Sequence, residues 1–312
     1  MLTVQILTKN NQNTILKTLE SLNGLKPRIL IGDYGSVDDT LDICKKFQAE
    51  IFRFKGIPRN EARNRLINIS KEDWNLWIEP WESILQNPQG YKKINDNRGY
   101  VRLIKGSMVT WELRFWKDKA EFINPIFETI DSGIGSNSTT VIASCGGINS
   151  NEAIEMLDEW KNSDPMSNKP YYYQSCLFLA QGKYDEFIRM SEHYLFLDKR
   201  INMSTTMIRY YQALVQINEF KSVKNSLKKL NLCLCAKPLM AEFWCLTGDV
   251  YYHLLHKFKM ANEFYENALI LGKKRLGSDR WPMDISKYEK YPKMMIDSCN
   301  KILSKNTDFI PI

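Results

Sequence analysis

Two glutamates stand in a short turn after an apolar run, and their carboxylates are the first candidates for chemistry in this chain. The segment Trp74–Glu82 reads Trp-Asn-Leu-Trp-Ile-Glu-Pro-Trp-Glu, which predicts a buried strand ending at Glu79 and an acidic turn reaching Glu82. In α/β domains, ligands bind in the crevice outside the carboxyl ends of the strands. Carboxylates at such an edge commonly hold a metal ion and the phosphates that it neutralises. Pro80 and Trp81 separate the two glutamates, so metal binding by this turn is the central question of the sequence.

Length and composition limit the classes of protein to which the chain can belong. With 312 residues it is expected to form two domains, at roughly 150 residues per domain. The hydrophobic share of 44% and the charged share of 25% are ordinary for a globular protein. The formal charge of +7 is modest and favours anionic ligands such as nucleotides. The basic residues are dispersed without a basic and aromatic stripe, so no nucleic-acid partner is expected.

The termini, the apolar runs and the cysteines together predict a cytoplasmic location. The first residues, Met1–Leu7, lack a basic region and a cleavage site, and they are typical of a first strand. No run of about 18 apolar residues occurs, so no membrane span is expected. The seven cysteines are odd in number and lack framework spacing, which suits a reducing compartment. Cys233 and Cys235 are expected to be small core residues.

The first half alternates apolar runs with amphipathic segments, which predicts parallel strands joined by right-handed crossovers. Strands are expected at Leu2–Thr8, Arg28–Asp33, Ala49–Phe54 and Trp74–Glu79, and a helix at Asn60–Ile69. Asn13 is expected to cap a first helix whose apolar face is Ile15, Leu16, Leu19 and Leu22. Ser36 and Asp39 resemble a capping box that opens a second helix ending near Phe47.

The pattern then changes to antiparallel pairing and ends at a cluster of turn residues. Gly99–Ile104 and Met108–Trp116 flank a Lys-Gly-Ser turn and predict a hairpin. A last strand is expected at Thr139–Cys145, and the turn-forming segment Gly146–Asn151 predicts a boundary. The predicted domains are therefore residues 1–147 and 148–312.

The second half is expected to be all-helical and to repeat. Tyr171, Tyr210 and Trp244 can each open a helical hairpin, at separations near the 34-residue period of tetratricopeptide repeats. The last copy matches that pattern best, with one residue inserted near His256. The tail Phe309–Ile312 is expected to be loose or to dock on the last helix.

Five segments of the first half stand in a characteristic order. They are Leu7–Asn11 (LTKNN), Gly32–Thr40 (GDYGSVDDT), Ala62–Asn64 (ARN), Trp74–Glu82 and Glu112–Trp116 (ELRFW). Together they resemble a family 2 glycosyltransferase of the GT-A fold. The matching family segments are Asn-Glu, Asp-x-Gly-Ser-x-Asp-x-Thr, Ala-Arg-Asn, Asp-Ala-Asp-Glu and Arg-Leu-Phe. The resemblance implies an α/β GT-A domain, like nucleotide-diphospho-sugar transferases, followed by the tetratricopeptide-like repeats, a fusion known in the family.

The resemblance also implies a nucleotide-sugar site. Its implied residues are Thr8, Asp33, Gly35, Arg63, Glu79 and Trp81. Asp33 would accept the imide N–H of uracil, near Thr8, and Gly35 would allow a tight turn beneath the nucleotide. Arg63 would face the base or the diphosphate, which a guanidinium can bind with two hydrogen bonds. As simpler interpretations, Arg63 is a solvated helix residue and Asp38 only starts a helix.

The sequence departs from the family at the metal site. The family's first aspartate, which contacts ribose, aligns with Glu79, and the second, the usual ligand of Mn²⁺ or Mg²⁺, aligns with Trp81. A tryptophan side chain offers no lone pair to a hard cation. Glu79 and Glu82 are the remaining candidate ligands, and Glu82 would need a rearranged turn.

Two histidines of the family are also replaced, by Phe127 and Ser144, and all three histidines of the chain lie in the helical half. An inverting transfer needs a carboxylate to take the proton of the acceptor hydroxyl, and Glu128 is the candidate by position, against a simple surface role. Without a metal, the charge of the leaving group would fall to arginines. The nearest by motif are Arg59, Arg63 and Arg114.

The sequence therefore predicts a glycosyltransferase that moves a sugar from a nucleoside-diphosphate donor, UDP by resemblance, to a protein, peptide or glycan acceptor with inversion. The helical repeats would bind the acceptor or form a homodimer. The alternative is a catalytically silent GT-A-like scaffold, which Trp81, Phe127 and Ser144 favour. A repeat adaptor alone leaves the motifs of the first half unexplained.

Overall fold

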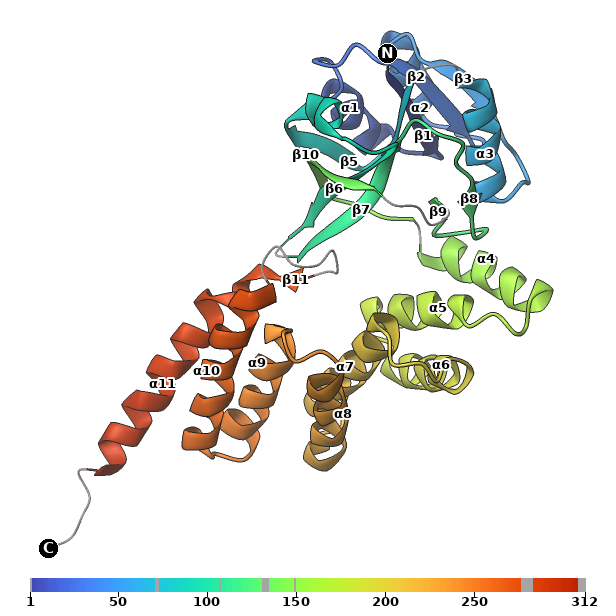
Figure 1. Ribbon diagram of the computed structural model, residues 1–312. Helices are drawn as coiled ribbons and strands as arrows, with labels where there is room; N and C mark the ends of the chain where they lie inside the picture. Colours follow the sequence, from blue (N-terminus) through green and yellow to red (C-terminus); the bar gives the residue numbers. More distant parts are fainter. Residues whose placement is uncertain are drawn as a thin grey trace, which may run out of the picture. The chain divides into compact units, whose positions relative to one another are not determined.

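The computed structural model describes residues 2–70, 73–106, 108–130, 135–148, 150–275 and 283–307 (Figure 1). The chain divides into two compact units, Met1–Met156 and Leu157–Ile312. The division falls inside helix α4 (Ser150–Ser163), nine residues beyond the end of the domain predicted from the sequence. The predicted tail Phe309–Ile312 lies outside the described residues.

The first unit contains the expected parallel strands, β1 (Leu2–Thr8), β2 (Arg28–Asp33), β3 (Glu50–Arg53) and β4 (Trp74–Trp77). Strand β1 pairs in parallel with β2 on one side and with β4 on the other. Their register places Thr8 opposite Asp33, so the carboxyl ends of the two strands open at one edge. The first and second strands have the predicted bounds.

Antiparallel strands extend this sheet in the order β3-β2-β1-β4-β7-β6-β10-β5. Strands β6 (Arg98–Lys105) and β7 (Met108–Trp116) form the predicted hairpin, and β7 pairs with β4. Strand β10 (Ser136–Ser144) lies between β6 and β5 (Glu82–Gln86). Strand β5 was not predicted: Glu82 begins a strand directly after the turn. Short elements complete the unit: 3-10 helix η1 (Pro88–Lys93) and the paired strands β8 (Phe122–Ile123) and β9 (Thr129–Ile130).

Helices cover both faces of the parallel strands (Figure 1). Helices α1 (Gln12–Glu20) and α2 (Thr40–Lys46) pack on the face that includes Val4 and Ile6. Helix α3 (Arg59–Ile69) packs on the opposite face, where Ala62 and Leu66 contact Leu7. Side chains alternate along a strand, which explains why Ile6 and Leu7 contact different layers.

Two local predictions in this unit are wrong. Asn13 lies within α1, whose N-cap is Asn11, and Leu16 of the predicted apolar face is exposed. Ser36 does not cap α2. Its hydroxyl accepts a hydrogen bond from the Asn10 backbone N–H at 3.0 Å. The loops after β1 and β2 therefore bind each other through a contact that local patterns do not reveal.

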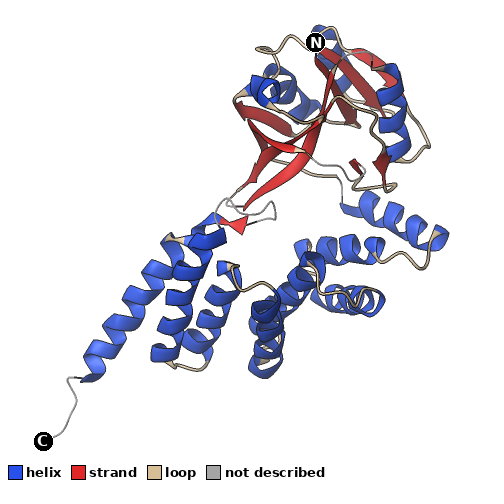
Figure 2. Cartoon of the chain, viewed as in Figure 1, coloured by secondary structure: helices blue, strands red, loops and turns tan. Residues whose placement is uncertain are grey.

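The second unit is helical, as predicted (Figure 2). Three successive hairpins are α5–α6, α7–α8 and α9–α10, and α11 follows. Their bounds are α5 (Lys169–Ala180), α6 (Tyr184–Leu197), α7 (Met203–Asn218), α8 (Val223–Ala236), α9 (Ala241–Asp249), α10 (Phe258–Arg275) and α11 (Lys290–Thr307). Strand β11 (Met283–Asp284) and 3-10 helix η3 (Ile285–Tyr288) precede α11.

The third hairpin accommodates the inserted residue through a π-helical turn, η2 (Val250–Leu254), which ends two residues before His256. Leu255 donates its backbone N–H to Val250 at 3.1 Å, five residues earlier. A single π turn absorbs one extra residue inside a helix. The turn thus explains the insertion that the repeat pattern indicated.

Close packing and buried hydrogen bonds join the last helices. Gly248 of α9 lies against the fully buried ring of Tyr265 on α10, where a Cβ would stand 2.7 Å from a ring carbon. Asp249 accepts hydrogen bonds from Tyr265 at 2.7 Å and from Tyr291 of α11 at 2.6 Å. Among the described residues, no helix has both the length and the apolar character that a membrane crossing requires.

Candidate active site

The predicted nucleotide residues of the first unit follow the carboxyl ends of three adjacent parallel strands. Thr8 ends β1, Asp33 ends β2, and Glu79 follows β4 by two residues. The Tyr34 backbone N–H donates to the Thr8 carbonyl at 2.9 Å, and Ile78 donates to Gln5 at 3.2 Å. The parallel pairing therefore continues into the segments that carry these side chains.

Asp33 is buried, and it organises the turn that follows β2. Its two carboxylate oxygens accept the backbone N–H groups of Gly35 at 3.1 Å and Ser36 at 3.0 Å. Gly35 has a φ of +92°, which a side chain would strain. Asp33 therefore stabilises the loop after β2. Its carboxylate oxygens still have lone pairs that can accept a hydrogen bond from a further donor.

Asp38 has the structural role that the simpler interpretation assigned to it. Its carboxylate accepts the backbone N–H groups of Thr40 at 3.1 Å and Gln12 at 3.2 Å. The Thr8 hydroxyl donates to the Asn11 side chain at 2.9 Å. These bonds connect the loops after β1 and β2 and so define one wall of the edge.

Arg63 is a fully buried cation and not a solvated helix residue. Its Nη2 lies 2.5 Å from Glu79, and its Nε lies 2.7 Å from Glu128. Its guanidinium carbon lies 4.6 Å from the ring centroid of Trp77 and 5.3 Å from that of Phe122. Its Nη1 is buried and lacks a hydrogen-bond partner among the described residues.

Arg59, the first residue of α3, contacts the same two carboxylates. Its Nε lies 3.1 Å from each carboxylate oxygen of Glu128, and its Nη2 lies 3.3 Å from Glu79. Its side chain is 12% exposed, whereas that of Arg63 is 0% exposed. Arg59 is therefore the arginine of this pair with the more exposed side chain.

Glu82 is held by a different arginine, Arg114 of β7. Two parallel hydrogen bonds of 2.9 Å join the guanidinium to the carboxylate, and Glu82 also accepts the Glu79 backbone N–H at 2.9 Å. The Arg114 guanidinium carbon lies 3.5 Å from the ring centroid of Trp77, and Glu112 accepts from it at 2.7 Å. Glu82 thus fixes the turn and completes a buried bidentate pair.

Burial and the arginines act in opposite directions on the carboxyl pKa values. Burial acts to raise the pKa of Glu128, but Arg59 and then Arg63 overcome it and hold the pKa at about 2. For Glu79, burial outweighs the opposing Arg63 and Arg59 and raises the pKa above its ordinary value. A base with a pKa near 2 takes up a proton weakly at neutral pH, so Glu128 in these ion pairs is poorly suited to general-base catalysis.

The two candidate metal ligands do not form a cation site in this arrangement. Glu79 faces Arg63 and Arg59, and Glu82 faces Arg114, so each carboxylate already has a positive partner. Among the residues that the structure describes, no group of three His, Cys, Asp or Glu side chains is placed to hold a metal ion. The residues of the turn therefore do not fit a divalent cation.

Trp81 is half-buried and packs on the end of β10. A Cβ on Gly146 would stand 2.7 Å from the Trp81 Cβ, and the Trp81 carbonyl accepts the Cys145 backbone N–H at 3.1 Å. Ser144, in the place of a family histidine, pairs in register with Glu82. Phe127, in the place of the other, adopts a φ of +51° beside Glu128.

The sequence indicated the three arginines but not the glutamates with which they pair. It did not indicate Tyr34 as a site residue. The Tyr34 hydroxyl is buried and lacks a hydrogen-bond partner among the described residues, and burial raises its pKa above the ordinary range. Tyr34 packs against the core cluster that includes Ala62 of α3, the helix that carries Arg59 and Arg63. Its position directly after Asp33 was the one available signal.

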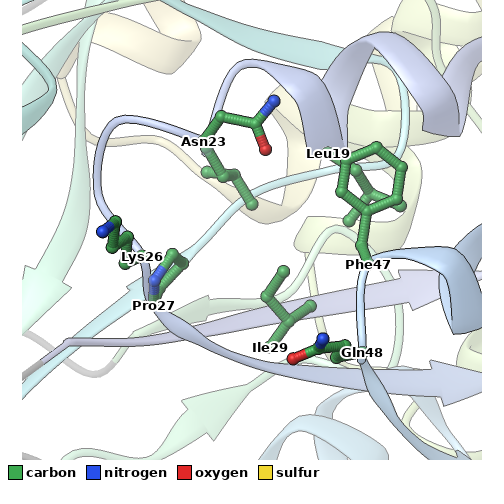
Figure 3. A pocket seen from close by; sticks show the side chains of 8 residues that line it. Leu19, Asn23, Lys26, Pro27, Ile29, Phe47 and Gln48 are labelled. Carbon is green, nitrogen blue, oxygen red and sulfur yellow. The ribbon is translucent and has the colours of Figure 1, made fainter.

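A separate pocket of about 370 Å³ lies at the start of β2, at the opposite end of that strand from Asp33 (Figure 3). Its lining combines apolar side chains with polar groups, and Lys26 is its charged residue. The lining residues are Leu19, Leu22, Asn23, Lys26, Pro27, Ile29, Phe47 and Gln48. It contains none of the predicted site residues.

Comparison with known families agrees with the resemblance. The model of the family described as Glycosyl transferase family 2 matches residues 3–79, which extend from β1 to Glu79. This segment contains Thr8, Asp33, Gly35, Arg63 and Glu79. The chain thus has an α/β domain with a segment that matches the family 2 model, followed by helical hairpins. No curated protein matched the sequence.

Solved helical structures also match part of the chain. MamA 41-end from Desulfovibrio magneticus RS-1 is 20% identical, with 51% of this chain and 84% of that chain covered and a TM-score of 0.38. The Sgt2 TPR domain from Aspergillus fumigatus is 12% identical, with 46% and 85% covered and a TM-score of 0.35. These scores are low, so the helical architecture rests on the three hairpins themselves.

Proposed function

We propose that the protein is a glycosyltransferase that takes a sugar from a nucleoside-diphosphate donor, with UDP as the first candidate nucleotide. The main support is the family match over residues 3–79, which contains the strand ends bearing Thr8, Asp33 and Glu79. Ligands of parallel α/β sheets bind at this edge. The donor would therefore bind beside the buried arginine and glutamate cluster.

The proposed roles follow from the residues at that edge. Asp33 would accept the N–H of the base with its remaining lone pairs, and Glu79 would contact ribose. In an inverting transfer the acceptor oxygen bonds to the anomeric carbon, the nucleoside diphosphate leaves with the bonding electrons, and a carboxylate takes the hydroxyl proton. Glu128 is the proposed carboxylate, and release of at least one of its arginines would make it a stronger base.

The helical unit is proposed to bind a protein, peptide or glycan acceptor, or a second copy of the chain. Stacked helical hairpins make extended surfaces suited to protein contacts. A cytoplasmic setting belongs to the same proposal, and the odd number of seven cysteines supports it.

A catalytically silent scaffold is the second candidate function, and one observation favours it. The three glutamates that would do chemistry, Glu79, Glu82 and Glu128, are all bound to buried arginines. Such a network can serve as a core that keeps the family fold without its activity.

Donor turnover separates the two functions. The full chain would be incubated with a panel of UDP-sugars and GDP-sugars, with candidate peptide and glycan acceptors, and nucleoside diphosphate release would be measured. The transferase proposal predicts release that falls strongly in Asp33→Ala and persists in Lys45→Ala, an exposed control in α2. Nucleotide binding without any release would favour the scaffold, and no nucleotide binding would contradict the transferase.

A further inference from the structure

Two guanidinium groups contact Glu79, which lies in the turn where the family resemblance implies a divalent cation. The carboxylates of Glu79 and Glu128, which would flank the leaving group, share Arg59 as a common partner. We propose that Arg59 is the built-in cation of this site and binds the donor diphosphate directly, without a metal ion. The inference rests on the proposed function, because it assigns the charge that the donor's diphosphate would meet.

The balance of charge in the cluster supports this assignment. Three arginines (Arg59, Arg63 and Arg114) face three buried or nearly buried glutamates (Glu79, Glu82 and Glu128). Each of these buried glutamates thus has an arginine partner without any added ion, and the partly exposed Glu112 also pairs with Arg114. A divalent cation bound to Glu79 would have to lie close to the two guanidinium groups that contact it at 2.5 and 3.3 Å. Like charges at such separations in a buried site strongly oppose binding.

Access selects Arg59 from the three arginines. Its side chain is 12% exposed, against 0% for Arg63 and 3% for Arg114. No hydrogen bond of its Nη1 occurs within the part of the chain that the structure describes. Arg59 also begins α3, an eleven-residue helix, so the positive end of the helix dipole lies at this residue.

Unsatisfied buried groups beside Arg59 point to a polar ligand. The Nη1 of Arg63 and the hydroxyl of Tyr34 are buried and lack partners within the described residues. Buried polar groups normally find a partner in the protein, in water or in a ligand. Both groups can donate a hydrogen bond, and the oxygens of a phosphate accept hydrogen bonds.

This arrangement would also couple donor binding to the proposed base. The donor diphosphate would replace the Glu128 carboxylate as the anionic partner of Arg59. Arg59 would then bind the donor and no longer Glu128. Of the attractions that lower the Glu128 pKa, that of Arg59 is the largest. Its departure would raise the pKa of Glu128 only when a leaving group is in place.

The test is calorimetric titration of the full chain with UDP, GDP, CDP and dTDP, in EDTA and in Mn²⁺. For the tightest nucleotide we expect equal affinity in both buffers. Arg59→Gln should weaken diphosphate binding by about tenfold or more, because it removes charge-assisted hydrogen bonds. The corresponding nucleoside should bind Arg59→Gln and the wild type equally. Arg65→Gln is the matched control, since Arg65 is an exposed arginine of the same helix.

The outcomes separate the two proposals. Binding that requires Mn²⁺ would overturn the role of Arg59 and leave the transferase proposal intact, as would an unchanged affinity in a folded Arg59→Gln variant. If no nucleotide binds in either buffer, both proposals fail. If Arg59→Gln does not fold, Arg59→Lys is the second variant. It keeps the positive charge but cannot form the two parallel hydrogen bonds of a guanidinium. It should still bind the diphosphate in EDTA, with lower affinity than the wild type.

Discussion

The guanidinium of Arg59 lies against the carboxylate of Glu128, with its Nε 3.1 Å from each carboxylate oxygen. The two residues are 69 positions apart in the chain, and each also contacts a further charged group, Glu79 or Arg63. This contact joins the start of a helix to the segment proposed to supply the base. It belongs to a network in which Arg59 and Arg63 both contact Glu79 and Glu128.

The buried pair of Glu82 and Arg114 should contribute strongly to stability. Glu82→Ala would leave Arg114 buried beside Glu112 alone, and breaking a buried pair on one side costs about 3–5 kcal/mol. Glu112→Ala is the control, because Glu112 is partly exposed and should cost about 1 kcal/mol or less. Urea denaturation measures both values. Equal losses would show that the Glu82 pair has no special role.

Glu128 should make stability sensitive to acid. Its folded pKa of about 2 lies below its ordinary value of 4.5, so its contribution is present above about pH 4.5 and is lost as the pH falls toward 2. Glu128→Gln removes this titration. The difference in unfolding free energy between wild type and variant should therefore shrink across that window. A difference that stays constant from pH 5 to pH 2.5 would contradict the ion pairs of Glu128.

The turn after β2 should require glycine at position 35 because of its backbone conformation. Lack of room for a side chain is not the reason. A Cβ on Gly35 would meet no atom within 4 Å, but its φ is +92°. Gly35→Ala should therefore cost about 1 kcal/mol of unfolding free energy and weaken nucleotide binding. Gly24→Ala provides the comparison, since its Cβ also meets open space and its φ is not left-handed. Denaturation curves that rank the two variants equally would refute the conformational argument.

Replacing Gly248 by alanine should not give the gain in stability that this substitution usually gives in a helix. Alanine normally stabilises a helix over glycine by about 1 kcal/mol. Here its Cβ would stand 2.7 Å from the buried Tyr265 ring, so Gly248→Ala should instead destabilise the protein by about 1–3 kcal/mol. In a Tyr265→Ala background the same change should cost less. Additive effects in thermal or chemical denaturation would contradict this contact.

Sequence patterns predicted the parallel strands and the repeats because both depend on local periodicity. Strands β1 and β2 have the predicted bounds, because each is a short segment rich in apolar residues. Strand β5 was missed because its opening residue, Glu82, is charged and has its partner in Arg114, 32 residues away. The failed cap at Ser36 has a similar cause, since its partner Asn10 lies 26 residues earlier.

The sequence predicted which residues belong to the candidate site, but not the ion pairs and hydrogen bonds between them. Motif positions indicated Asp33, Arg63, Glu79 and Glu128, and the fold places Arg63 with Glu79 and Glu128. Side-chain type alone gave Glu79 and Glu82 as metal ligands. Their pairing with arginines depends on contacts between α3, β7 and the turn, which periodicity does not encode.

The most direct test of a metal-independent donor site is a crystal grown with the nucleoside diphosphate and Mn²⁺, with anomalous diffraction recorded at the manganese edge. We predict diphosphate oxygens within hydrogen-bond distance of the Arg59 guanidinium and no anomalous peak at Glu79 or Glu82. A manganese peak bound to either glutamate, with Arg59 displaced from the phosphates, would contradict this account.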